Sequence, residues 1–128
     1  FVALIPSGLG DPVYEKLEAK LANALMSLPA SKGFEIGEGF KAATMRGSQH
    51  NDPYTIENGK VVTKTNHAGG LLGGISTGMP LVGRVAFKPT SSIQGKQEST
   101  TVNKESATFE LAPGSRHDPC VAISAVPV

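Results

Sequence analysis

The sequence contains one cysteine and no tryptophan among its 128 residues. A single thiol, Cys120, excludes an internal disulfide and fits a reducing compartment. With no tryptophan and only five phenylalanines, we expect no aromatic platform for stacking single-stranded nucleic acid. The net charge is +1, and the sequence has neither a basic tract nor a basic helix face, so the charge pattern also gives no sign of a nucleic-acid partner.

Long apolar runs are also missing. No stretch approaches the roughly 20 residues that span a bilayer, and no signal-peptide pattern opens the sequence, so we expect no membrane partner. The 39% hydrophobic and 18% charged residues are typical of an ordinary globular protein. Both ends of the sequence lie inside apolar runs, and we therefore expect residues 1–128 to be one fragment of a longer chain.

The clearest predicted element is a helix over residues 11–28. Asp11 followed by Pro12 is typical of a helix start, and leucines then recur at helical spacing until Pro29. Met26 is expected to fill the core beneath this helix. We predict a buried strand at Phe1–Ile5, an Asn58-Gly59 hairpin, further strands at 34–40, 79–87, 100–102 and 108–111, and a second helix after Cys120. This pattern is α+β, with antiparallel strands.

The stretch from Asn66 to Ser92 organises the rest of the chain. It contains four glycines in six residues, Gly69, Gly70, Gly73 and Gly74, which leave the backbone bare and permit positive φ. It closes on a cation, a rigid proline and three hydroxyls: Lys88, Pro89, Thr90, Ser91 and Ser92. The two motifs together favour a flat or anionic ligand over the glycines, whereas tight turns between strands explain either motif taken alone.

A second polar cluster follows at Arg116-His117-Asp118-Pro119-Cys120. Arginine suits phosphate or carboxylate recognition and Asp118 suits a base, although a loop salt bridge with a helix cap at Asp118 fits equally well. A metal site drawn from His50, His67, His117 and Cys120 lacks the short ligand spacing of zinc sites, so no metal is expected. Cys120 opens an apolar run, which favours a buried hydrophobe over a nucleophile.

The motifs at 66–76, 88–92 and 116–120, together with Ala125-Val126-Pro127-Val128, closely resemble the chorismate synthase family. The segments at 8–19, 24–27, 32–37 and 46–48 extend the resemblance from end to end. The resemblance implies a C-terminal part of a catalytic domain in which long helices lie between antiparallel sheets. It also implies a homotetramer in the cytoplasm, or in the plastid if the source is a plant.

The resemblance implies a reaction as well. Members of the family remove phosphate and a proton from 5-enolpyruvylshikimate 3-phosphate by 1,4-anti elimination, which gives chorismate. The reaction needs reduced FMN without net redox change.

The family's flavin contacts fall on Pro29, Ala30, Gly73, Lys88, Pro89, Thr90, Ser91, Ser92 and Arg116. Arg116 would also face the substrate's phosphate or carboxylate, and Asp118 is the family's proposed partner of the flavin N5 proton. Two positions depart from the family pattern: Ser124 stands where an arginine is usual, and Pro29 where a polar residue is often found.

The family's N-terminal arginines and catalytic histidines have no match here, and none of the three histidines in this sequence replaces them. We therefore expect the 128-residue polypeptide by itself to be inactive. Two other interpretations remain, a flavin- or anion-binding module without catalysis and a structural fragment whose glycines only form turns.

Overall fold

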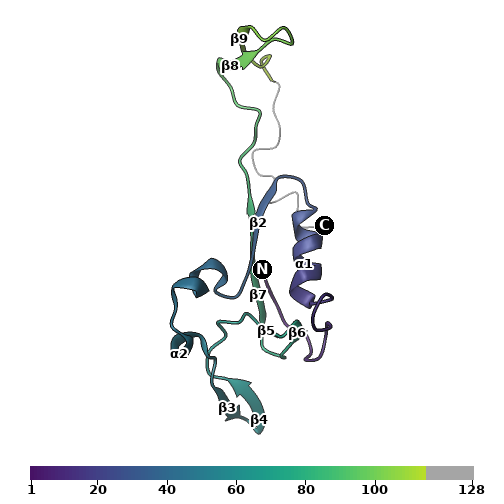
Figure 1. Ribbon diagram of the computed structural model, residues 1–128, viewed down its shortest axis with the longest axis vertical. Helices are drawn as coiled ribbons and strands as arrows, with labels where there is room; N and C mark the ends of the chain where they lie inside the picture. The colour runs from purple at the N-terminus through teal and green to yellow at the C-terminus, as the bar shows by residue number, and fades with distance from the viewer. Residues whose placement is uncertain (115–128) are drawn as a thin grey trace. The chain divides into compact units, whose positions relative to one another are not determined.

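The computed structural model describes residues 1–114, which divide into a first unit of residues 1–86 and a second unit that begins at Phe87 (Figure 1). The first unit contains a three-stranded sheet in the order β1-β7-β2. Its strands are β1 (Val2–Ala3), β2 (Ser31–Ile36) and β7 (Leu81–Phe87), and helix α1 (Leu17–Met26) packs beside β2. Helix and antiparallel strands confirm the predicted α+β class.

The remaining elements are short. They are the 3-10 helix η1 (Gly39–Thr44), helix α2 (Gly47–His50), the hairpin β3 (Tyr54–Glu57) with β4 (Lys60–Thr63), and the hairpin β5 (Leu71–Leu72) with β6 (Ile75–Ser76). In the described part of the second unit, residues 87–114, there is a further hairpin, β8 (Gln97–Thr100) with β9 (Ser106–Phe109).

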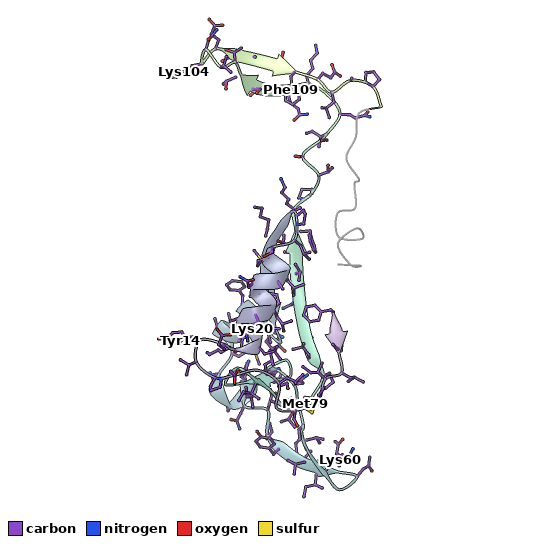
Figure 2. The ribbon with its side chains drawn as sticks, turned by 90° about the vertical axis from the view of Figure 1, so that its right-hand side faces the viewer. Tyr14, Lys20, Lys60, Met79, Lys104 and Phe109 are labelled. Atoms are coloured by element: carbon purple, nitrogen blue, oxygen red, sulfur yellow. The ribbon has the colours of Figure 1, made fainter. Side chains whose placement is uncertain are left out.

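Helix α1 begins six residues later than the Asp11-Pro12 signal predicts. Residues 11–16 form a loop in which Val13 has φ 67° and Tyr14 is 91% exposed (Figure 2). The N–H of Leu17 donates instead to the carbonyl oxygen of Gly74 at 2.9 Å. A contact 57 residues away along the chain therefore fixes the start of the helix, and it overrides the local signal.

The helix ends close to the predicted stop. Ser31 is only 7% exposed, and its hydroxyl donates to the carbonyl oxygens of Met26 and Leu28, which the end of the helix leaves without helical partners.

Two burial predictions were wrong. Met26 is 42% exposed, and the strand at the N-terminus is neither five residues long nor buried, since Val2 is 69% and Leu4 85% exposed.

The bounds of three other strands also differ from the prediction. The strand predicted at 34–40 runs over 31–36, because Gly37 and Gly39 adopt positive φ (57° and 54°) and turn the chain into η1. In the second unit the strands predicted at 100–102 and 108–111 are found at 97–100 and 106–109, joined by a turn in which Lys104 has φ 66°. The helix predicted after Cys120 lies outside the described residues.

Two predictions for the first unit are confirmed. The Asn58-Gly59 hairpin pairs Ile56 with Val61, and the apolar strand predicted at 79–87 is β7. Within residues 1–114, the buried apolar side chains are those of Leu71 and Leu81, which lie in β5 and β7. The buried centre of the described chain is therefore next to the glycine-rich stretch.

Candidate functional site

The glycine-rich stretch forms the β5–β6 hairpin. Leu71 pairs with Ser76 and Leu72 with Ile75, and the two residues between them are Gly73 (φ 60°) and Gly74 (φ 92°). Positive φ at both central positions is the geometry that matches the twist of paired strands, and glycine adopts it without steric cost. The turn explanation of the glycines is thus correct as far as the backbone is concerned.

The glycines nevertheless differ in what lies next to them. A β-carbon at Gly70 would lie 2.6 Å from the carbonyl oxygen of Pro80, one at Gly74 would lie 2.6 Å from the Lys16 side chain, and one at Gly69 would meet the backbone of Gly37. Gly73 is exposed, and a β-carbon there would have nothing within 4 Å. Three glycines therefore accommodate the protein's own chain, and Gly73 leaves bare backbone accessible to another molecule.

The far strand of the hairpin is anchored to residues 6–17. Ser76 is 3% exposed; its hydroxyl accepts from the N–H of Leu9 at 2.9 Å and donates to the carbonyl oxygen of Pro6 at 2.6 Å. The backbones of Ser76 and Leu9 are also bonded, at 2.9 Å. With the bond from Leu17 to Gly74, these contacts fix the hairpin against the loop that precedes α1.

The chain before the hairpin is held by Asp52, which is 7% exposed. Its carboxylate accepts hydrogen bonds from the Thr65 hydroxyl at 2.6 Å and from the N–H groups of His67 and Ala68, both at 2.8 Å. Burial alone would raise the pKa of Asp52, but these three bonds together hold that pKa below its usual value of 3.8. Asp52 is therefore a carboxylate at neutral pH.

An ion-pair cluster lies beside the same segment. One oxygen of Glu38 is 2.9 Å from Nζ of Lys41 and the other is 2.9 Å from Nδ1 of His67, and these contacts hold the pKa of Glu38 below 4.5. The ring of His50 lies 5.8 Å from that of His67. Among the described residues, no three His, Cys, Asp or Glu side chains are placed to hold a metal ion. His117 and Cys120 lie outside that range.

Pro29 and Ala30 form the turn after α1, where Ala30 has φ 65°. They lie at the end of the helix opposite to Gly73, because α1 starts beside Gly74 and its ten residues are about 15 Å long. The structure therefore does not bring Pro29 and Ala30 next to the glycine turn.

Lys88 to Ser92 belong to the second unit. Lys88 is exposed, Thr90 and Ser92 are half-buried, and the N–H of Ser92 donates to the Thr90 hydroxyl at 3.4 Å. Arg116, Asp118 and Ser124 lie outside the described residues.

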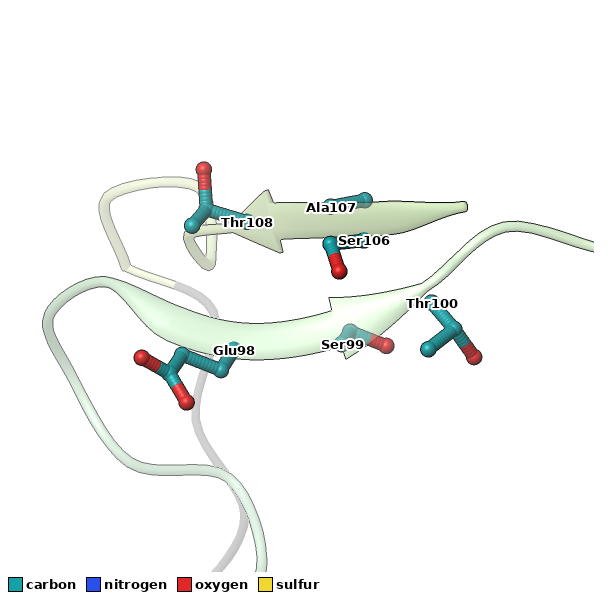
Figure 3. Close-up of a pocket in the computed structure, with 6 residues that line it drawn as sticks. All are labelled: Glu98, Ser99, Thr100, Ser106, Ala107 and Thr108. Carbon is teal, nitrogen blue, oxygen red and sulfur yellow. The ribbon is translucent and has the colours of Figure 1, made fainter. Parts of the chain in front are cut away.

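The second unit also has an open hollow along its hairpin (Figure 3). Figure 3 shows its side chains spread along the two strands and not gathered about one point. A ligand site needs a few polar groups that converge, so this hollow is a weaker candidate than the glycine hairpin. The hollow is lined by Glu98, Ser99, Thr100, Ser106, Ala107 and Thr108.

Comparison with known proteins identifies the chain's family. A family model described as chorismate synthase matches residues 1–128. The chain belongs to the chorismate synthase family. It is 63% identical over 124 residues to the chorismate synthase of Protochlamydia amoebophila, a match that covers 97% of this chain and 34% of that protein. It is 55% identical over 125 residues to the chloroplastic chorismate synthase of Capnoides sempervirens, covering 97% and 28%.

A solved structure agrees with these sequence matches. A crystal structure of chorismate synthase superposes with a TM-score of 0.63 at 43% identity, and covers 67% of this chain and 27% of that one. The chain spans about a third of the length of the curated chorismate synthases that it matches. The predicted family and its α+β fold are thereby confirmed. In the part of the chain that is described, no helix is long and apolar enough to cross a membrane.

Sequence reasoning missed two residues of the candidate site. Asp52 and Ser76 are buried polar residues that fix the hairpin from either side. The hydrogen-bond partners of Asp52 lie 13–16 residues away along the chain, and those of Ser76 lie 67–70 residues away. No short sequence motif therefore contains both partners of such a bond. The only available signal was a carboxylate in the Asn51-Asp52-Pro53 loop before a hairpin, and that pattern is common in turns.

Proposed function

We propose that this chain is the C-terminal portion of an enzyme that converts 5-enolpyruvylshikimate 3-phosphate to chorismate by 1,4-anti elimination of phosphate. The observation that carries the proposal is the 63% identity to a named chorismate synthase over 97% of the chain. The motifs at 66–76, 88–92 and 116–120 lie inside the residues that the family model matches. We further propose a homotetramer, located in the cytoplasm or, for a plant source, in the plastid.

Reduced FMN is the proposed cofactor. When bound, it supplies electron density to the substrate and recovers it, so the elimination needs no net oxidant. The described residues fit a flavin at one point in particular, because Gly73 leaves exposed backbone with nothing within 4 Å of a would-be β-carbon. A flat ring needs such a bare surface, and Pro29 and Ala30 would contact the cofactor at the other end of α1.

The polar residues take complementary roles in this proposal. Lys88, followed by Pro89 and the hydroxyls of Thr90, Ser91 and Ser92, would bind the phosphate tail of FMN by charge and hydrogen bonds. Arg116 would bind an anionic group of the substrate and the flavin, since guanidinium forms paired bonds with phosphate or carboxylate. Asp118 would accept the proton at flavin N5.

The 128-residue polypeptide by itself should not form chorismate. Elimination requires clamps on the substrate's charges and a proton donor for the leaving phosphate. Arg116 would supply only one of these groups, since the family resemblance places the other arginines and the catalytic histidines in the N-terminal region, and this chain spans about a third of its relatives. Chorismate formation by the isolated chain would contradict this part of the proposal.

The test is a titration of the whole protein with reduced FMN, followed by flavin fluorescence after reoxidation and by chorismate formation. Lys88→Ala and Arg116→Ala should each weaken flavin binding at least tenfold, about the effect of losing one charged hydrogen bond. Lys104→Ala, in the β8–β9 turn, is the matched control and should bind as the wild type does. Flavin binding without turnover would favour the non-catalytic module, and equal binding by all three variants would refute the assigned contacts.

A further inference from the structure

Asp52 is a buried charge that the proposed reaction does not use. It is 7% exposed and has φ 45°, a left-handed conformation that is uncommon for residues other than glycine. Burial and this conformation both cost free energy, and such costs persist when the surrounding contacts offset them. The offsetting contacts here are the three hydrogen bonds that its carboxylate accepts.

All three donors lie in one short segment. Oδ1 accepts from the hydroxyl of Thr65 and the N–H of His67, and Oδ2 accepts from the N–H of Ala68. The carbonyl oxygen of Pro53 accepts from the N–H of Lys64 at 2.9 Å, which joins the same two segments once more. The Asp52-Pro53 loop thus fixes residues 64–68 as a unit.

This fixed segment leads directly into the glycine hairpin. Asn66 continues the chain of bonds: its side chain accepts from the N–H of Gly70 at 2.8 Å and donates to the carbonyl oxygen of Pro80 at 2.8 Å. The N–H of Val82 donates to the carbonyl oxygen of Gly69 at 3.1 Å. Residues 65–70 are therefore tied to Asp52 on one side and to β7 on the other, three residues before Gly73.

We propose that Asp52 is a positioning residue for the flavin: its carboxylate fixes the segment Thr65–Ala68 and so holds the Gly73 backbone where the cofactor ring contacts it. This proposal rests on the proposed FMN site. Asp52 itself touches neither flavin nor substrate, and it acts through the backbone of the segment that it binds.

The test compares four variants with the wild type in the whole protein. Asp52→Asn keeps the shape but places an amide donor opposite an N–H. Thr65→Val removes one hydrogen bond, and Thr65→Ser retains it. Glu57→Gln removes a carboxylate from the exposed β3–β4 hairpin and is the charge-matched control. Two quantities are measured: amide hydrogen exchange at His67 and Ala68 without flavin, and the KM for reduced FMN alongside kcat.

We expect Asp52→Asn to raise exchange at both amides and to raise the KM for FMN about tenfold, with kcat retained at saturating flavin. Thr65→Val should show a smaller rise of about threefold, and Thr65→Ser and Glu57→Gln should match the wild type. A loss of kcat at every flavin concentration, without a change in KM, would show a merely structural role and overturn the proposal. If Asp52→Asn does not fold, the Thr65→Val and Thr65→Ser pair decides.

The two proposals fail in different ways. Wild-type protein that does not bind reduced FMN would refute the proposed function and, with it, this inference. Wild-type protein that binds FMN, beside an Asp52→Asn variant with raised exchange and an unchanged KM, would refute the positioning role alone.

Discussion

The first unit contains two hairpins with the same kind of turn and different surroundings. Asn58 (φ 50°) and Gly59 (φ 75°) join β3 to β4, and Gly73 (φ 60°) and Gly74 (φ 92°) join β5 to β6. The β3–β4 strands have four residues each, and their apolar side chains at Tyr54, Ile56 and Val61 are about 70% exposed. The β5–β6 strands have two residues each. Gly74 and Ser76 are bonded to residues 6–17, and Gly69, just before β5, is bonded to Val82 of β7.

The two surroundings distinguish a turn that its own sequence determines from a turn that contacts with distant segments hold in place. The β3–β4 hairpin follows from its own sequence, an Asn-Gly pair between β-forming residues. The β5–β6 hairpin depends on contacts with segments far away in the sequence, and those contacts place Gly73 in the fold. A hairpin that presents backbone to a ligand needs the second kind of support, because a displaced backbone cannot make the contact.

The largest effect should come from Gly74→Ala. A β-carbon there would lie 2.6 Å from Lys16 Cγ and 2.8 Å from the carbonyl oxygen of Asp11, at φ 92°. We expect a loss of about 3 kcal/mol in the free energy of unfolding, from left-handed strain and overpacking together. Gly59→Ala, where a β-carbon meets nothing within 4 Å, should lose only about 1 kcal/mol. Urea unfolding of both variants checks the difference, and equal losses would contradict it.

Ser76→Ala should have the next largest effect. The substitution leaves the N–H of Leu9 and the carbonyl oxygen of Pro6 without their hydroxyl partner in a site where Ser76 is 3% exposed. We expect about 2 kcal/mol of destabilisation. Ser99→Ala, at an exposed position of β8, should stay within about 0.5 kcal/mol. Chemical denaturation measures both variants, and a Ser76→Ala loss as small as that of Ser99→Ala would show that the hairpin is not anchored through this hydroxyl.

Much of the fold could be predicted from local patterns, and the site could be predicted only in part. The Asn58-Gly59 turn and strand β7 carry their signals within a few residues, and both are where the sequence placed them. The start of α1 was wrong because the partner of Leu17 is Gly74, which the local Asp11-Pro12 signal does not include. The glycine run was recognised, but its division into three packed glycines and one open glycine depends on Gly37, Pro80 and Lys16.

A smaller effect concerns the dependence of stability on pH. The pKa of Asp52 is lowered in the folded state, so its stabilising contribution is complete above its usual value of 3.8 and is lost as the pH falls through the lower folded value. The wild type should therefore lose more stability between pH 5 and pH 3 than Asp52→Asn, in which Glu38 still titrates. The free energy of unfolding, measured at several pH values for the wild type and for Asp52→Asn, gives the slope of stability against pH for each protein. Parallel slopes would show that the carboxylate of Asp52 does not stabilise the folded state.

The contact between Gly73 and the cofactor is tested most directly by comparing Gly73→Ala with Gly59→Ala in the whole protein, titrated with reduced FMN. The two sites share positive φ and open space, so each variant should lose about 1 kcal/mol of stability. We expect Gly73→Ala to weaken flavin binding about tenfold or more, because a methyl group separates the ring from the backbone, and Gly59→Ala to bind as the wild type does. Equal flavin affinity in the two variants would contradict the claim that the open glycine of the β5–β6 turn contacts the cofactor.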